Sequence, residues 1–323
     1  MTTVLLTGAA GFIGARTAHL LLDRGCRVIG VDNLNDYYDV RLKEHRLQGL
    51  DAREGFRFVR GDIENPELVD SLFLKEHPDV VLNLAARAGV RYSMVNPRVY
   101  MTTNAMGTLN LLEAMRHHRV GKLVLASTSS LYAGQAMPFA ETLPVNTPVS
   151  PYAASKKAAE VMAYSYHYLH GIDVSVVRYF TVYGPAGRPD MSVFRFIRWI
   201  DDGVPIELFG DGNQARDFTY VDDIAAGTVA AMKPLGFEVV NLGGGNQPVS
   251  MLDMIAILEE LLGKKATLDR QPMNKADVPA TWADIAKADR LFGWRPEVSL
   301  RDGLARTVEW YLANREWVRQ VTL

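Results

Sequence analysis

The chain has 323 residues, of which 48% are hydrophobic and 22% are charged. This balance is typical of a globular protein and excludes a disordered chain or a fibrous repeat. The 35 basic and 37 acidic side chains leave a net charge of −2, so we expect no nucleic-acid partner, because such binders usually carry a basic excess. A single cysteine, Cys26, excludes an internal disulfide and a cysteine-based zinc site.

Membrane and targeting signals are not recognisable in the sequence. The chain reaches an apolar run at Val4 without a basic leader, and no stretch approaches the ~18 uncharged apolar residues that span a bilayer. We therefore expect a cytoplasmic protein with no membrane partner.

Short apolar runs alternate with longer helical patterns through the first part of the chain. Near-continuous apolar runs suit strands that are covered on both faces, and the intervening lengths suit crossover helices, which predicts a parallel, doubly wound α/β sheet. Ser150-Pro151 predicts the start of one helix and Gly171 its end. The predicted strands are 4–7, 27–31, 56–59, 80–84, 123–127, 174–179 and 239–242.

The regular alternation fades after Tyr179. A loop rich in glycine and proline covers 183–189, and helical patterns follow near 192–202 and 250–262. We expect residues 1–180 to form the sheet domain and residues 181–323 to form a smaller mixed α/β cap that binds the substrate. The run at 239–242 is expected to return to the sheet, so the two domains interleave.

A glycine-rich turn follows the first predicted strand and opens a helix. Its spacing is G-x-x-G-x-x-G, with Gly8, Gly11 and Gly14. Glycines let the backbone approach a pyrophosphate, and a helix N-terminus offers free N–H groups. Asp32, at the end of the second strand, is placed to accept hydrogen bonds from the adenosine ribose and to repel a 2′-phosphate, which favours NAD over NADP. The alternative for Asp32 is a simple turn cap.

Tyr152 and Lys156 are four residues apart on the predicted helix, so both side chains share one face. A phenol titrates near pH ~10, and a role as base at neutral pH needs about 4 kcal/mol of extra stabilisation of the phenolate. A neighbouring ammonium and the cation of an oxidised nicotinamide supply it. The hydroxyl-rich turn at 126–130 follows a strand at the edge where open α/β sheets bind ligands. A surface pair and a turn without function are the alternatives.

Together these segments resemble the extended short-chain dehydrogenase/reductases that act on nucleotide sugars, and the resemblance covers essentially the whole chain. It implies a Rossmann-type fold with tightly held NAD, Tyr152 as the base, Lys156 as its ribose-binding partner, and Thr128 as the hydroxyl beside sugar C4. Asn83 stands where many relatives have histidine, and only a local effect is expected. The matching motifs are T-G-x-x-G-x-x-G at 7–14, D-N-L at 32–34, N-L-A-A at 83–86, the turn at 126–130, Y-x-x-x-K at 152–156 and R-Y-F-T-V-Y-G-P at 178–185.

The resemblance also implies which residues contact the coenzyme. Asp62 and Ile63 follow the third strand as expected adenine contacts, although a surface turn is nearly as plausible for them. The predicted coenzyme contacts are Gly8, Gly11, Phe12, Ile13, Gly14, Asp32, Asn33, Asn35, Asp62, Ile63, Leu84, Ala85, Ala86, Tyr152 and Lys156.

The chemistry that follows C4 oxidation depends on extra acids and bases. The 4,6-dehydratases of the family carry an Asp-Glu pair directly after the threonine, and the decarboxylases usually carry a glutamate in the same turn. This chain has Ser129 and Ser130 there, which cannot abstract a C5 proton. The remaining reaction is oxidation, rotation of the 4-keto sugar and hydride return to its other face, which is 4-epimerisation.

Segments 32–39, 88–93 and 187–191 look like the branch of the family that acts on UDP-glucuronate. Arg188 is expected to bind the C6 carboxylate with a planar, charge-assisted fork. The alternatives are that it binds the diphosphate or forms a salt bridge with a cap helix. The other predicted substrate contacts are Ser129, Ser130 and Thr181, Arg216 at the family's pyrophosphate arginine, and Asp277 at the uridine ribose. Asn274 replaces a second arginine of the galactose-type epimerases.

The resulting hypothesis is an NAD-dependent isomerase that converts UDP-glucuronate to UDP-galacturonate. The alternatives are a UDP-glucose/galactose 4-epimerase, a UDP-glucuronate decarboxylase and, in a different class, a non-catalytic NAD-sensing protein. The resemblance implies a homodimer, and helices near 98–116 and 152–170 could form its interface, although apolar faces there could equally pack on the sheet. The histidines, including His117-His118, lack the spacing of metal ligands, so no metal site is predicted.

Overall fold

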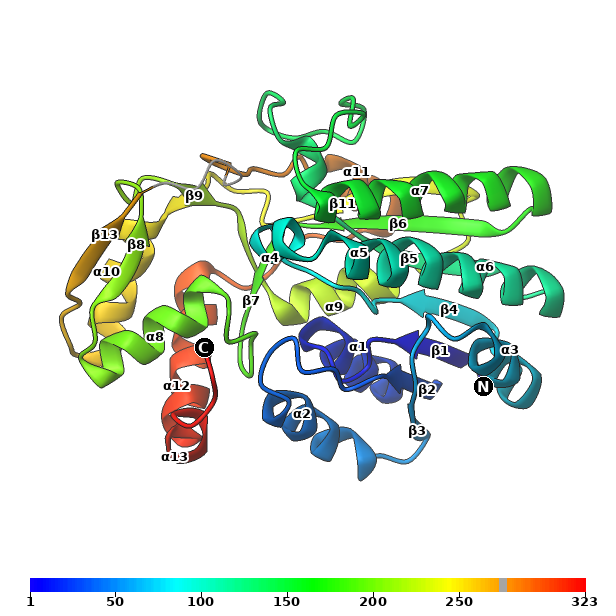
Figure 1. Cartoon of the computed structure of the whole chain (residues 1–323), viewed down its shortest axis with the longest axis horizontal. Coiled ribbons are helices and arrows are strands. Elements are labelled where there is room, and N and C mark those ends of the chain that lie inside the picture. The colour runs from blue at the N-terminus through cyan, green and yellow to red at the C-terminus, as the bar shows by residue number, and fades with distance from the viewer. Residues whose placement is uncertain (273–277) are drawn as a thin grey trace.

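A seven-stranded sheet forms the larger lobe of the molecule (Figure 1). The computed structural model describes residues 1–272 and 278–323. Every neighbouring pair in the sheet is parallel, and the strand order is β11-β6-β5-β4-β1-β2-β3, which confirms the predicted doubly wound sheet. The strands are β1 Thr3–Thr7, β2 Arg27–Asp32, β3 Phe56–Arg60, β4 Val80–Asn83, β5 Lys122–Thr128, β6 Asp173–Tyr179 and β11 Phe237–Leu242.

Helices cover both faces of the sheet because successive strand side chains point to opposite sides. In β1, Val4 and Leu6 pack into one apolar cluster, whereas Leu5 packs into the other. Helices α1 Phe12–Asp23, α2 Arg41–Asp51, α9 Val221–Ala230 and α11 Ala286–Phe292 complete the first cluster. Helices α3 Pro66–Glu76, α6 Gly107–His118 and α7 Pro151–His170 complete the second.

Helix α7 begins and ends where the sequence predicts. The Ser150 hydroxyl accepts a hydrogen bond from the backbone N–H of Ala153 at 3.2 Å, and Pro151 takes the first helical position. Gly171 ends the helix in the left-handed region with φ of +70°. This start places Tyr152 and Lys156 in the first turns of the helix.

The smaller lobe packs beside the sheet, at the left of Figure 1. Its apolar cluster lies among α8 Ser192–Asp202, α10 Met251–Leu262 and α12 Leu300–Ala313. Three two-stranded sheets complete it: β7 Thr181–Tyr183 with β10 Phe218–Tyr220, β8 Ile206–Phe209 with β13 Leu268–Gln271, and β9 Ala215–Arg216 with β12 Val249–Ser250. Short helical turns are α4 Val90–Val95, α5 Pro97–Tyr100, η1 Met101–Met106, η2 Ser129–Tyr132 and α13 Arg315–Val318.

The direction of the chain across the sheet reverses at β1. From β1 the chain adds β2 and β3 on one side, and then β4, β5, β6 and β11 on the other. Loops leaving β1 and β4 therefore part at their carboxyl ends, which is where sheets of this kind bind ligands. Within the described residues, no helix has the length and apolar character needed to cross a membrane.

Candidate active site

A cleft of about 760 Å³ lies at this edge of the sheet and is lined by residues of both lobes. It brings together all predicted site residues that the structure describes. Asp277 lies outside the described residues, as does Asn274. The predicted residues that line the cleft are Gly8, Gly11, Phe12, Ile13, Gly14, Asp32, Asn33, Asn35, Asp62, Ile63, Leu84, Ala85, Ala86, Thr128, Ser129, Ser130, Tyr152, Lys156, Thr181, Arg188 and Arg216.

The glycine loop between β1 and α1 leaves no room for side chains. Gly8 has a φ of +71°, and a Cβ on it would lie 2.7 Å from the backbone nitrogen of Ala85. A Cβ on Gly14 would lie 2.0 Å from the carbonyl oxygen of Gly8. Both positions therefore require glycine. The N-terminus of α1, at Phe12, borders the cleft directly after this loop, so the loop fits the pyrophosphate of a dinucleotide.

Asp32 ends β2, and its carboxylate is buried at the wall of the cleft. Oδ2 accepts a hydrogen bond from the backbone N–H of Ala10 at 3.2 Å, and Oδ1 accepts one from Leu34 at 2.9 Å. The Nζ atom of Lys43 lies 3.4 Å from Oδ1. The carboxylate thus caps the following turn and also faces the cleft, so the two predicted roles are compatible.

Polar side chains are linked along the same wall. The Asn33 amide donates to Asp62 at 2.7 Å, the Asn35 amide donates to Asn33 at 2.6 Å, and Arg87 donates to Asn35 at 3.0 Å. This series connects the turns after β2, β3 and β4. It holds the predicted adenosine contacts in fixed positions.

Asn83, the position that departs from many relatives, is buried at the end of β4. Its Oδ1 accepts a hydrogen bond from the Thr7 hydroxyl at 2.7 Å, and its Nδ2 donates to Thr108 at 3.0 Å. Asparagine here ties β1 and β4 to α6.

The hydroxyl groups of Thr128 and Tyr152 meet where β5 ends beside the start of α7. A side-chain hydrogen bond joins them, and the Thr128 hydroxyl also accepts from the backbone N–H of Ser130 at 3.1 Å. Lys156 is buried, and its Nζ donates to the carbonyl oxygen of Ala126 at 2.8 Å. The Tyr152 ring packs edge-on against Tyr100 with 6.0 Å between the ring centres. The three predicted catalytic residues therefore form one group.

Burial favours the uncharged forms of Tyr152 and Lys156. Burial raises the pKa of the Tyr152 phenol above its ordinary range, and the hydrogen bond with Thr128 opposes that shift. Burial lowers the pKa of Lys156 to about 8, although the Glu160 carboxylate raises it. Lys156 therefore remains protonated at neutral pH.

Sequence reasoning missed the buried ion pair behind the catalytic group. Glu160 on α7 receives two hydrogen bonds from Arg178 on β6, at 2.9 and 2.7 Å. The same carboxylate accepts from the Ser127 hydroxyl at 2.7 Å, directly before Thr128. The pair holds α7 against β6, and the Ser127 hydrogen bond ties β5 to the same carboxylate. The only sequence signal for Glu160 is its position one helical turn after Lys156.

Asn104 is a second residue that sequence reasoning missed. It lies in the π-helical turn η1 and is buried. Its amide donates to the carbonyl oxygen of Arg87 and to the Ser155 hydroxyl, at 3.0 and 2.9 Å, and its Oδ1 accepts from the N–H of Arg87 at 2.8 Å. It therefore holds the segment after β4 against the helix that carries Tyr152.

Arg188 lies in the loop after β7 and lines the same cleft, and its charge lowers the pKa of the Tyr152 phenol. Its Nε and Nη2 bind the two oxygens of Asp190 at 3.0 and 2.6 Å, and Nη2 is 3.4 Å from the carbonyl oxygen of Ala88. The guanidinium lies over the Tyr37 ring, 5.6 Å from its centre. Burial lowers the pKa of Arg188, but the Asp190 carboxylate contributes to a larger opposite shift. The net pKa shift is therefore upward, and the guanidinium is a permanent cation.

Arg216, on β9, lines the cleft from the cap. Its Nη1 donates to the carbonyl oxygens of Ala215 at 2.9 Å and Pro279 at 3.4 Å. It shares the cleft with Arg188 and with three further arginines, Arg87, Arg91 and Arg195.

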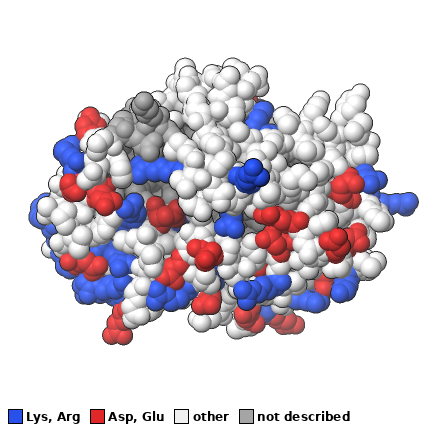
Figure 2. All heavy atoms as spheres, in the orientation of Figure 1, with Lys and Arg blue, Asp and Glu red and all other residues white. Residues whose placement is uncertain are grey.

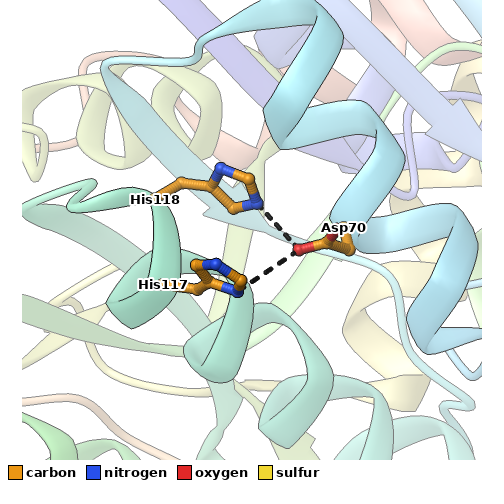
Figure 3. A group of neighbouring side chains, drawn as sticks. All are labelled: Asp70, His117 and His118. Atoms are coloured by element: carbon orange, nitrogen blue, oxygen red, sulfur yellow. Dashed lines mark hydrogen bonds and ion pairs between the residues drawn. The ribbon is translucent and has the colours of Figure 1, made fainter.

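The histidine pair at the end of α6 lies beside an acid that the sequence pattern did not connect to it (Figure 3). His118 Nε2 lies 2.7 Å from an oxygen of Asp70 on α3, and His117 Nδ1 lies 3.8 Å from the same oxygen. The three candidate ligand atoms all lie within 4.8 Å of one another, a spacing that could hold a metal ion. The contact as it stands joins α3 to α6.

Comparisons with known proteins agree with this geometry. A model of the NAD dependent epimerase/dehydratase family matches residues 4–243. A UDP-glucuronate 4-epimerase of Thermodesulfobacterium geofontis is 58% identical over 317 residues, which is 98% of each chain. The crystal structure of a UDP-glucuronic acid 4-epimerase from Bacillus cereus, in complex with UDP-glucuronic acid and NAD, superposes with a TM-score of 0.92 at 39% identity, covering 97% of this chain and all of that one. A UDP-glucose 4-epimerase of Thermotoga maritima with UDP-glucose has a TM-score of 0.88 at 31% identity, covering 98% of this chain and 100% of that one.

Proposed function

Because this chain belongs to the NAD-dependent epimerase/dehydratase family, we propose that it interconverts UDP-glucuronate and UDP-galacturonate by transient oxidation at C4. The observation that carries this proposal is the shared cleft. It places the hydrogen-bonded pair Thr128 and Tyr152 in the same cavity as the permanent cation Arg188. The C4 hydroxyl of one sugar can thus meet Thr128 and Tyr152 while its C6 carboxylate meets Arg188. The relatives that act on UDP-glucuronate support the choice of substrate.

The residues around the glycine loop are proposed to hold NAD. Gly8, Gly11 and Gly14 admit the pyrophosphate to the N-terminus of α1, and Asp32 receives the adenosine ribose. Lys156 is proposed to bind the nicotinamide ribose. When bound, NAD would supply a reversible acceptor for the C4 hydride.

The protein's own groups move the proton of the C4 hydroxyl. Tyr152 takes this proton as the hydride leaves C4, with Thr128 holding the hydroxyl in line. The positive charge of Lys156 favours the phenolate form of the base. After the 4-keto sugar has rotated, Tyr152 returns the proton to the C4 oxygen on the other face. Protons and electrons balance, and no net NADH is formed.

The hydroxyl turn after β5 limits the reaction to epimerisation. Ser129 and Ser130 line the cleft where dehydratases of the family carry an acid pair. The 4-keto intermediate of a glucuronate is a β-keto acid, which loses CO2 when its carboxylate is free to turn. Arg188 is proposed to hold that carboxylate, and Arg216 to bind the diphosphate.

The product profile from UDP-glucuronate tests the proposal. Purified protein with NAD should form UDP-galacturonate until both sugars are at equilibrium, without added reductant. Release of CO2 with a pentose nucleotide would assign the decarboxylase instead. Conversion of UDP-glucose in preference to UDP-glucuronate would assign the glucose-type epimerase, and failure to convert either with NAD bound would leave an NAD-sensing protein.

We also propose that residues 1–180 with strand β11 form the coenzyme half, and that 181–323 form the substrate cap. The pairing of β11 with β6 supports this interleaved division. A small anionic substrate rather than nucleic acid is supported by Figure 2, in which basic and acidic side chains are interspersed over the face shown. A cytoplasmic location stays a prediction.

A homodimer through α7 is part of the proposal. Val161, Tyr164 and Tyr168 are exposed large apolar side chains at helical spacing, and Leu169 adjoins them. Such a stripe on a solvent-facing helix is typical of a protein interface. Tyr168→Glu should convert a dimer to a monomer in light scattering, and a monomeric unaltered protein would contradict this part.

A further inference from the structure

Arg46 on α2 is buried behind the cleft and does not line it. Five hydrogen bonds fix its guanidinium, and all of these acceptors are neutral oxygens. Nε and Nη2 donate to the carbonyl oxygen of Ala186 at 3.0 and 2.7 Å, and Nη2 reaches that of Gly187 at 3.3 Å. Nη1 donates to the carbonyl oxygen of Ala10 at 3.1 Å and to the Tyr38 hydroxyl at 2.7 Å. One side chain thus joins the glycine loop to the loop that carries Arg188.

The loop that Arg46 holds has a strained backbone. Ala186 has a φ of +51°, in the left-handed region that side chains other than glycine rarely adopt. A Cβ on Gly187 would lie 3.1 Å from the carbonyl oxygen of Gly184, so the turn is also tight. Such a conformation persists only where surrounding contacts determine it. The bonds from Arg46 to two consecutive carbonyl groups are contacts of this kind.

The residue directly after this strained pair is Arg188. Its guanidinium must lie between Asp190 and the Tyr37 ring to face the sugar end of the cleft. A rotation of the 186–187 peptides moves the Cα of Arg188 and with it the whole fork. The orientation of the Arg188 guanidinium therefore depends on the hydrogen bonds that Arg46 makes to the 186–187 backbone.

We propose that Arg46 is a positioning residue for the recognition of the sugar carboxylate. It fixes the 186–187 backbone against the glycine loop and so sets Arg188 for a carboxylate at C6. Lysine cannot replace it, because a single ammonium cannot span acceptors that a planar guanidinium reaches from three nitrogens. This inference rests on the proposed function, since it assumes that Arg188 binds the carboxylate.

Binding of two nucleotide sugars to Arg46→Lys tests this role. The NAD-loaded protein is titrated calorimetrically with UDP-glucuronate and with UDP-glucose, which differ only at C6. We expect the preference for UDP-glucuronate to fall about tenfold or more, since a misplaced Arg188 loses its charge-assisted hydrogen bond to the carboxylate, while the affinity for UDP-glucose changes little. A purely structural role would instead lower the melting temperature and weaken both ligands together.

A matched control variant distinguishes loss of Arg188 positioning from a general loss of protein stability. Arg315 binds the buried carboxylate of Asp201 at 2.7 Å on the far side of the cap and does not line the cleft. Arg315→Lys should lower the melting temperature and leave the ligand preference unchanged. Should Arg46→Lys not fold, Arg46→Gln is measured in the same way, because its amide can donate to the Ala186 carbonyl but carries no charge and no fork.

Equal affinity of the unaltered protein for UDP-glucuronate and UDP-glucose overturns the carboxylate role of Arg188, and the role of Arg46 with it, whereas the product profile tests the proposed reaction itself. A strong preference in the unaltered protein that persists in the Arg46 variant overturns the role of Arg46 alone. Loss of the preference in that variant, with UDP-glucose still bound, supports both.

Discussion

Replacing Arg188 with leucine tests how the cleft distinguishes an acidic sugar from a neutral one. Asp190 already occupies Nε and Nη2 at 3.0 and 2.6 Å, so the substrate carboxylate meets the edge that carries Nη1. One hydrogen bond to a charged group contributes about 1.5–3 kcal/mol. We therefore expect Arg188→Leu to bind UDP-glucuronate about 10- to 150-fold more weakly. UDP-glucose, with a neutral hydroxyl at C6, should bind almost as before.

Calorimetric titration of the NAD-loaded variant with each nucleotide sugar gives the two affinities, and chromatography of the products gives turnover. Arg198→Leu is the control, because Arg198 also lies on the cap and pairs with an acid, Asp202 at 3.4 Å, but does not line the cleft. Its variant should keep the ratio of the two affinities. Equal losses for both sugars in Arg188→Leu would contradict carboxylate binding by Arg188 and assign the guanidinium to the diphosphate or to the loop.

Three further predictions concern the catalytic group and a buried acid. Tyr152→Phe keeps the ring against Tyr100 but removes the proton acceptor, so nucleotide should still bind while turnover falls by roughly 10²–10⁴; unchanged turnover contradicts the assignment. Burial lowers the pKa of Lys156 from 10.5 to about 8, so its charge costs the folded state about 3 kcal/mol below pH 8, and this cost disappears as pH rises to 10.5. In urea unfolding, the stability of Lys156→Met relative to the unaltered protein should therefore decrease over that range, and a constant difference opposes the shift. Burial raises the pKa of Asp217 from 3.8 to about 6, so the unfolded state ionises first and stability falls by about 3 kcal/mol as pH rises between these values. Asp217→Asn should lack this slope, and parallel pH curves for the two proteins would count against it.

Patterns that repeat within a few residues were sufficient to predict the sheet. Apolar runs such as 4–7 and 174–179 are buried on both faces in β1 and β6, because hydrophobic periodicity depends on backbone geometry alone. The glycine loop was equally predictable, because a side chain at Gly8 or Gly14 would clash with neighbouring backbone atoms. Local signals therefore identified the fold, and the residues predicted from motifs line one cleft.

Contacts between distant segments were not predictable in the same way. Arg46 and Ala186 are separated by 140 residues, and nothing in the pattern around either one indicates the other. Glu160 and Arg178 form a buried pair only because α7 packs on β6, and Asn104 meets Arg87 through a π-helical turn. Residues that orient the catalytic group thus came from tertiary packing, whereas residues that line the cleft came from motifs.

The pKa shifts of Tyr152 and Lys156 limit the conditions under which Tyr152 can accept a proton. Burial raises the pKa of Tyr152 and lowers that of Lys156, so both side chains are biased toward their neutral forms. A neutral phenol cannot take the C4 proton. Lys156, with a pKa of about 8, keeps its charge at neutral pH, although burial in the cleft disfavours that charge. The additional positive charge that favours the phenolate comes with an oxidised nicotinamide. We therefore propose that Tyr152 acts as a base when an oxidised nicotinamide adds its positive charge to that of Arg188, which already lowers the pKa of the phenol.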